Sequence, residues 1–247
     1  MLPLAGLRIV VTRAAHQAEE LAQPLRECGA TAILLPMIGI APPENPVPLA
    51  KAIAEIDSYD WIVFTSVNGI RALGKQKCGA RIATVGAATR ESAERLGWTV
   101  SVTPETYVAE ALVEALGAEE LNGRRILIPS AAVTRDVVRD ELTNRGAIVQ
   151  VVEAYRNVIP ADAAEKAKEV FRVPFPDWIT FASSSAAENL ASLTTVQTLR
   201  HSKVASIGPV TSGTVREHGL LVTVEAKTHN VRGLVDAIVH AVAPKTA

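Results

Sequence analysis

The sequence predicts an α/β protein built from parallel sheets and divided into two lobes, with a cleft between the lobes and two strands linking them. Three observations lead to this prediction. Short apolar strands alternate with helical segments from end to end, several blocks of the chain are repeated, and a proline-bearing extended segment occupies an equivalent place in each repeat. Regular alternation of this kind is typical of parallel sheets covered by helices on both faces.

The individual elements follow from apolar periodicity and from glycine and proline punctuation. Apolar runs predict strands at 7–13, 60–65, 81–86, 99–103, 123–130, 178–183, 203–207 and 220–225. Helical spacing predicts helices at 16–28, 47–57, 67–75, 88–96, 108–117, 134–145, 161–172, 184–193, 196–200, 209–217 and 229–242. The segments 30–43 and 147–160 are predicted to be extended, and the prolines in the first make it a poor central strand.

An internal duplication relates the two halves of the chain. At an offset of 117 residues, GLRIVVTR at 6–13 matches GRRILIPS at 123–130, and WIVFTSVNGIRAL at 61–73 matches WITFASSSAAENL at 178–190. A longer block at 81–102 matches 203–224 at an offset of 122 residues. Matching blocks in the same order indicate repeated structural units.

The two extended segments define the expected domain boundaries. They follow the first strand and helix of each repeat, so both could cross from one lobe to the other. The first lobe then combines 1–36 with 158–247, the second is an insertion at 46–149, and the linker strands are 37–45 and 150–157.

Composition excludes several classes of protein. The chain has 247 residues, 48% of them hydrophobic, and a formal net charge of −1, so no general field attracts nucleic acid. The N-terminal stretch lacks the pattern of a signal peptide, and no apolar run approaches the length of a membrane span. We therefore expect a cytoplasmic monomer without nucleic-acid or membrane partners. The two cysteines and five histidines are scattered, which predicts no metal site.

Four turns are candidates for ligand binding because each follows an apolar strand and opens a helix. Small hydroxyl, amide and glycine residues occupy these turns: Thr65, Ser66 and Asn68; Gly86 and Thr89; Ser183 and Ser184; Gly208 and Thr211. One interpretation is ordinary helix capping, for which Ser, Thr and Asn are preferred. The other is anion binding by the free N–H groups at helix starts. No complete phosphate-loop motif, G-x-G-x-x-G motif or G-x-S-x-G nucleophile elbow occurs in the chain.

Four further residues are candidates outside these turns. Arg13 ends the first strand and is expected to point into the cleft, whereas Lys203 opens a strand and suits a solvated end better than a ligand contact. Tyr155 lies in the second crossover, where its phenol could either donate a proton or pack between the lobes. Tyr107 is a weaker candidate of the same kind.

Taken together, these motifs resemble the uroporphyrinogen-III synthase family. The resemblance rests on VVTR at 10–13, the extended segment at 29–43, YDWIVFTSVNGI at 59–70, TVGAAT at 84–89, VEAYRN at 152–157, TFASSSA at 180–186 and ASIGPVTSGTV at 205–215. It implies two flavodoxin-like lobes joined by a two-stranded linker. It also implies a cofactor-free lyase that closes linear hydroxymethylbilane to uroporphyrinogen III, losing water and inverting ring D through a spiro-pyrrolenine intermediate.

The resemblance also suggests roles for the candidate residues. Tyr155 matches the family's tyrosine between the lobes and is the expected catalytic residue. Arg13 and Gly86 are expected substrate contacts because of their positions after strands. The resemblance implies the same role for Thr65, Ser66, Asn68, Thr89, Ser183, Ser184, Lys203, Gly208 and Thr211. The expected partner is the polycarboxylate substrate, received by transient hand-over from hydroxymethylbilane synthase. A two-lobed protein that binds a small molecule or a tetrapyrrole without turnover is the alternative.

Overall fold

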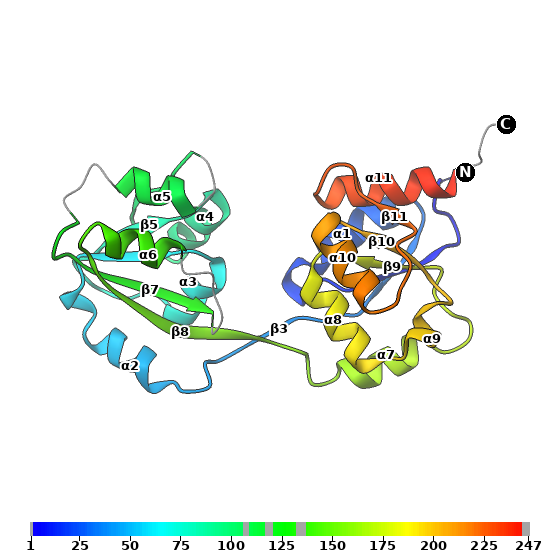
Figure 1. Ribbon diagram of the computed structural model, residues 1–247, viewed down its shortest axis with the longest axis horizontal. Helices are drawn as coiled ribbons and strands as arrows, with labels where there is room; N and C mark the ends of the chain where they lie inside the picture. Colours follow the sequence, from blue (N-terminus) through cyan, green and yellow to red (C-terminus); the bar gives the residue numbers. More distant parts are fainter. Residues whose placement is uncertain (1, 106–108, 117–120, 132–136, 244–247) are drawn as a thin grey trace. The chain divides into compact units, whose positions relative to one another are not determined.

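The computed structural model describes residues 2–105, 109–116, 121–131 and 137–243 (Figure 1). The chain divides into two compact units, one formed by Met1–Gly39 with Val158–Ala247 and the other by Ile40–Asn157. Each unit is a parallel sheet covered by helices, so the predicted α/β class with parallel sheets is confirmed.

The sheet of the first unit has five strands in the order β11-β10-β9-β1-β2. All of its recorded strand pairs are parallel. In chain order this is the 2-1-3-4-5 arrangement of flavodoxin-like folds. The strands are β1 (Arg8–Val11), β2 (Thr31–Leu34), β9 (Trp178–Phe181), β10 (Lys203–Ser206) and β11 (Val224–Glu225).

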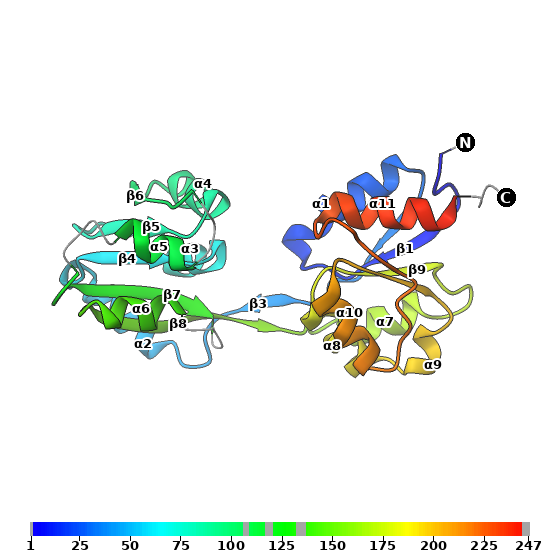
Figure 2. The ribbon, with the colours of Figure 1, turned by 45° about the horizontal axis from the view of Figure 1, so that its top comes forward.

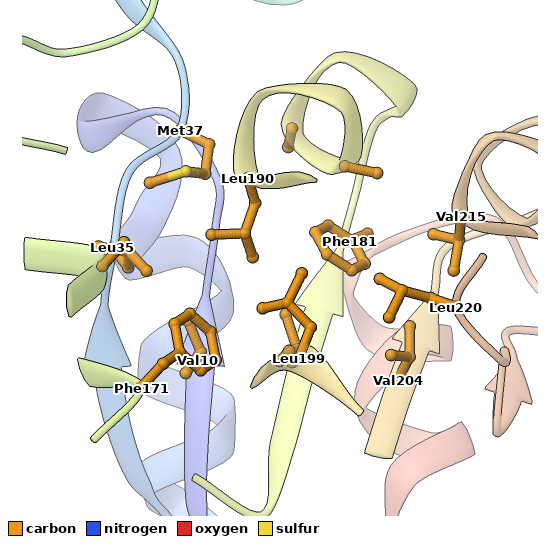
Figure 3. Close-up of a cluster of buried hydrophobic side chains, with 14 of the residues drawn as sticks. Val10, Leu35, Met37, Phe171, Phe181, Leu190, Leu199, Val204, Val215 and Leu220 are labelled. Carbon is orange, nitrogen blue, oxygen red and sulfur yellow. The ribbon is translucent and has the colours of Figure 1, made fainter. Parts of the chain in front are cut away.

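Helices cover both faces of this sheet, as Figure 2 shows for the unit that carries the two chain ends. One face packs on α1 (Ala15–Glu27) and α11 (Val231–Val242). The other packs on α7 (Ala163–Val170), α8 (Ser184–Leu193), α9 (Val196–Leu199) and α10 (Pro209–Glu217). Neighbouring residues of β1 face opposite ways. Ile9 contributes to the first core, and Val10 contributes to the second, which Figure 3 shows.

The sheet of the second unit has the order β3-β8-β7-β4-β5-β6. Its strands are β3 (Gly39–Ala41), β4 (Trp61–Phe64), β5 (Arg81–Thr84), β6 (Val100–Val102), β7 (Arg125–Ala131) and β8 (Ile148–Val158). The duplication pairs β7, β8, β4, β5 and β6 with β1, β2, β9, β10 and β11, and these strands stand in the same spatial order. The two units are therefore circular permutations of one sheet topology.

Helices also cover both faces of this second sheet. One core contains residues of α2 (Val47–Ala54), the short 3-10 helix η1 (Ile56–Ser58), α3 (Val67–Leu73) and α4 (Ala87–Arg95). The opposite core contains residues of α5 (Ala109–Leu116) and α6 (Val137–Asn144). Strand β4 is buried on both sides, with Ile62 and Phe64 in the first core and Trp61 and Val63 in the second.

The observed elements differ from the predicted ones in three places. Strand β11 has only two residues, Val224 and Glu225, which pair with Ala205 and Ser206 of β10. The predicted helix at 47–57 is divided into α2 and η1. The segment 150–157 is part of a longer strand, because β8 begins at Ile148 and pairs with β7 as far as Tyr155.

A duplicated aspartate fixes the amino ends of the central strands. Asp60 precedes β4 and accepts a hydrogen bond from the backbone N–H of Arg125 at 2.9 Å. Asp177 precedes β9 and accepts the equivalent bond from the N–H of Arg8 at 2.8 Å. The Arg125 N–H is the main cause that holds the pKa of the Asp60 carboxyl below its ordinary value, with a further contribution from the Arg124 guanidinium.

Replacing Asp60 with Asn should reduce stability in a pH-dependent way. A lowered carboxyl pKa in the folded state stabilises the protein above the unfolded-state pKa of about 4, and this contribution is lost as the pH falls through the folded-state pKa. We expect a loss of about 1 kcal/mol in the free energy of unfolding at pH 7, disappearing in strong acid. Denaturant unfolding at both pH values measures the difference. The control is Asp57→Asn in η1, and an equal effect there would contradict the assignment.

Candidate active site

The turn after β4 begins α3 with a capping serine. Ser66 has extended backbone angles (φ −154°, ψ 157°), and its Oγ accepts a hydrogen bond from the N–H of Gly69 at 3.1 Å. This satisfies one of the free N–H groups that every helix start presents. The interpretation of this turn as a helix cap is therefore correct for the Ser66 side chain. Thr65 and Asn68 flank it and are half-buried.

The phenol of Tyr155 lies 3.0 Å from the Ser66 hydroxyl. Tyr155 is buried, with 9% of its surface exposed, and belongs to the core that β4 and α3 share. The two predicted residues are 89 positions apart in the chain, and the strands that carry them, β4 and β8, lie on either side of β7 in the same sheet. No sequence pattern had linked them.

An irregularity in β8 sets the position of Tyr155. Ser130 of β7 pairs with Glu153, whereas the next residue, Ala131, pairs with Tyr155, so one residue of β8 is skipped. An extra residue of this kind bends a strand and redirects the side chains beyond it. The shift occurs immediately before Tyr155 and accounts for the register in which its phenol meets Ser66.

Gly69 lets α3 approach β7 closely. A Cβ atom at Gly69 would lie 2.6 Å from the carbonyl oxygen of Pro129, a distance that would require one of the two backbones to move. Because Gly69 also supplies the N–H that binds Ser66, its position is part of the same local geometry. The sequence pattern marked the turn but missed this contact, which depends on a strand 60 residues away.

The second turn of this unit lies after β5. Gly86 is the residue before α4 and has no side chain to cap the helix, and Thr89 is buried in the first turn of α4. The hydroxyl of Thr84, at the end of β5, is 2.8 Å from that of Thr103. This hydroxyl pair links the carboxyl ends of β5 and β6 beside the Gly86 turn.

The first unit presents the duplicate of these turns. Ser183 caps α8 through a hydrogen bond from the N–H of Ala186 at 3.3 Å, and Ser184 is the first residue of that helix. Gly208 precedes α10, and a Cβ there would lie 3.1 Å from the ring of His229. Thr211, in the first turn of α10, is buried.

In the first unit, hydrogen-bonded polar side chains at the strand ends correspond to the Thr84–Thr103 pair of the second unit. Ser206 ends β10 and its hydroxyl contacts that of Ser212, which in turn donates to the carboxylate of Glu225. Ser206 and Glu225 are the duplicates of Thr84 and Thr103 at the offset of 122 residues. The two units thus use different residues for the same connection between strand ends.

Arg13 follows β1 and lies at the same sheet edge as the turns of the first unit. Its Nη1 is 3.2 Å from Oε2 of Glu20, and its side chain is 14% exposed. This approach is close enough for an ion pair but lacks hydrogen-bond geometry, and Nη1 has no hydrogen-bond partner among the described residues. The guanidinium therefore retains hydrogen-bonding capacity.

Lys203 does not join this group, which corrects one of the predicted contacts. It opens β10 and pairs with Trp178, the first residue of β9, so it lies at the amino end of the sheet. Its ammonium is 5.5 Å from the centre of the Trp178 ring. The turns at Ser183 and Gly208 follow the carboxyl ends of these same strands, at the opposite edge. Tyr107 lies outside the described residues.

Within the described residues, no helix is long and apolar enough to cross a membrane. No cluster of three or more His, Cys, Asp or Glu residues suits a metal ion in the ranges that the structure covers. A groove of about 540 Å³ runs along β11 and α11 and includes Glu225, Asp236 and His240, none of them a predicted site residue.

Comparison with known proteins identifies the family. A family model described as uroporphyrinogen-III synthase HemD matches residues 19–236. The chain belongs to the uroporphyrinogen-III synthase family. The family predicted from the ordered motifs is therefore confirmed, and with it the assignment to tetrapyrrole biosynthesis as a cyclising lyase.

Similar family members cover almost the whole chain. Uroporphyrinogen-III synthase of Synechococcus elongatus is 33% identical, over 96% of each chain. A putative uroporphyrinogen-III synthase of Methanothermobacter thermautotrophicus is 28% identical, over 93% of this chain and 96% of the relative. The crystal structure of the Helicobacter pylori enzyme aligns with a TM-score of 0.64 at 14% identity, covering 95% of this chain and 98% of that one. A Thermus thermophilus structure gives 0.57 at 16% identity, over 96% and 98%. Both structural likenesses support the fold.

Replacing Gly69 with Ala should destabilise the second unit. The added Cβ would meet the Pro129 carbonyl, and overpacking of this kind costs about 1–3 kcal/mol. The matched control is Gly213→Ala in α10, where no atom lies within 4 Å of the added Cβ. That change should be neutral or stabilising by up to about 1 kcal/mol. Denaturant unfolding of both variants measures the difference, and equal effects would contradict the close approach.

Proposed function

We propose that this chain cyclises linear hydroxymethylbilane to uroporphyrinogen III, with loss of water and inversion of ring D. The observation that carries the proposal is the family match over residues 19–236. The site geometry supports it, because Tyr155 and Ser66 meet at the edge of the sheet where parallel α/β proteins hold their ligands. In the same proposal, the substrate arrives by transient hand-over from hydroxymethylbilane synthase in the cytoplasm.

A polycarboxylate substrate suits the small polar turns. Helix starts offer N–H groups and a partial positive charge, and both favour carboxylates. Helices α4, α8 and α10 have nine or ten residues, whereas α3 has only seven, so we assign most of the carboxylate binding to the first three. The proposed contacts are Arg13, Thr65, Asn68, Gly86, Thr89, Ser183, Ser184, Gly208 and Thr211.

Tyr155 is the proposed proton donor. Protonation of the terminal hydroxyl of the bilane lets its C–O bond break and releases water. Ring D then attacks through the carbon that already joins it to the chain, which forms a spiro carbon–carbon bond. The original link of ring D breaks and re-forms at its other α-carbon, and the proton lost from that carbon restores the phenol. Holding the bilane in the conformation that leads to inversion accounts for the rest, since positioning alone can favour one product strongly.

The two units are the proposed lobes. In this arrangement the substrate lies in a cleft between Met1–Gly39 with Val158–Ala247 on one side and Ile40–Asn157 on the other. The segments 37–45 and 150–157 are the proposed linker, and the neighbouring positions of β3 and β8 in one sheet support a two-stranded connection. Contacts from both units would enclose a substrate of this size and keep its two ends together.

An isomer assay tests the proposal directly. Purified protein, coupled to a source of hydroxymethylbilane and followed by oxidation, should yield mainly the type III porphyrin. The bilane alone closes to the type I isomer, so a reaction without protein is the control. Production of type I alone would refute the enzymatic proposal. A chain that binds the tetrapyrrole and still gives only type I would be the non-catalytic binding protein that is the alternative.

Replacing Tyr155 with Phe should slow turnover more than it weakens binding. The substitution keeps the aromatic ring in the core and removes the only ionisable proton of the side chain. Loss of a general acid lowers kcat by about 100-fold or more, whereas KM should change by less than about threefold. Steady-state kinetics of the type III product measures both. The control is Tyr59→Phe, which removes a phenol hydrogen-bonded to Gln150 instead. An unchanged kcat in Tyr155→Phe would remove this residue from the chemistry.

A further inference from the structure

The Ser66 hydroxyl forms two hydrogen bonds, one with the Gly69 N–H and one with the Tyr155 phenol. A serine hydroxyl carries one hydrogen and can accept through two lone pairs. The N–H of Gly69 can only donate, so it occupies one lone pair of Ser66 Oγ. The hydrogen of Ser66 remains available, and the phenol oxygen of Tyr155, 3.0 Å away, is the other recorded partner of this hydroxyl among the described residues.

Two arrangements of the Ser66–Tyr155 bond remain, and they differ in where the phenol hydrogen lies. If Tyr155 donates to Ser66, its hydrogen is held inside the protein. If Ser66 donates to Tyr155, the phenol hydrogen is free to reach a ligand. No second protein partner of the phenol oxygen is recorded in the ranges that the structure covers. Only the second arrangement pairs the Ser66 hydrogen while leaving the Tyr155 hydrogen for chemistry.

The duplicated turn of the first unit shows that helix capping alone does not explain the contact between Ser66 and Tyr155. Ser183 is the duplicate of Ser66, and it caps α8 in the same way. The duplicate of Tyr155 at the offset of 117 residues is Ile38, an apolar residue packed against the core of the first unit. Capping therefore accounts for a serine in both units, but it does not account for the tyrosine, which is present in only one.

We propose that Ser66 is a positioning residue that donates its hydroxyl hydrogen to Tyr155 and so directs the phenol proton toward the substrate. The Gly69 N–H occupies one lone pair of Ser66 Oγ and leaves the hydroxyl hydrogen available for this bond. Ser66 then acts through Tyr155 and does not itself bind the substrate. This inference rests on the proposed function, because it assumes that Tyr155 is the proton donor.

The experiment compares two substitutions of Ser66. Ser66→Gly removes the hydroxyl, yet glycine is tolerated as a helix cap at little cost. We expect kcat for the type III product to fall about tenfold, because the phenol loses its fixed orientation, while KM changes less than about twofold. Ser66→Thr retains a hydroxyl that can cap and donate, so its kcat should stay within about threefold of that of the parent chain.

A double-mutant cycle distinguishes positioning from a general structural defect. In the Tyr155→Phe background there is no phenol to orient, so Ser66→Gly should lower kcat by less than about twofold. The matched control is Thr195→Gly, which removes the cap of α9, where Thr195 Oγ1 accepts from the N–H of Thr198 at 3.3 Å. Its kcat and KM should equal those of the parent chain.

The outcomes separate this inference from the proposed function. A parent chain that makes only the type I isomer would refute the proposed function itself. If the parent makes type III and Tyr155→Phe is slow, an unchanged kcat in Ser66→Gly would overturn the positioning role alone. A full tenfold loss on adding Ser66→Gly to Tyr155→Phe would overturn it as well. Nonadditive losses together with recovery by Ser66→Thr would support it.

Discussion

Parallel pairing of strands is the constraint on which the rest of the structure depends. In a parallel sheet every carboxyl end lies at the same edge, and each strand returns through a helix that starts there. Ser66 and Gly86 follow strands of one sheet, where Tyr155 is the last residue of β8 paired with β7, and Ser183 and Gly208 follow strands of the other sheet. Polar groups that are far apart in sequence are therefore collected at two sheet edges without any dedicated motif.

The duplication explains how two such edges arose and where they differ. Both units repeat the capping serine, the aspartate at the amino ends of the strands and a polar link between strand ends. The units differ in chemistry at two positions. The second unit has the Tyr155 phenol where the first has Ile38, and the first has the Glu225 carboxylate where the second has the Thr103 hydroxyl. The shared residues make the same structural contacts in both units, and the proposed catalytic tyrosine is among the residues that differ.

Much of the fold was predictable because each strand and helix depends on local periodicity. The extended segment predicted at 147–160 is observed as β8, but its pairing with β7 as far as Tyr155 is a matter of register and was not predictable. The error at Lys203 has a different origin. Its position at the start of β10 was visible in the sequence and argued for a solvated end, but the family resemblance placed it with the substrate contacts, at the wrong edge of the sheet.

The sequence by itself determined the α/β class, the duplication, the family and the turns that open the helices, because these depend on residue type and spacing along the chain. Only the tertiary structure decided which side chains meet. The hydrogen bond between Ser66 and Tyr155 requires two strands to lie at the correct separation and one residue of β8 to be skipped. The contact of Gly69 with Pro129 likewise depends on the distance between a helix and a neighbouring strand. Such contacts join distant residues through sheet register, for which a single sequence carries no local signal.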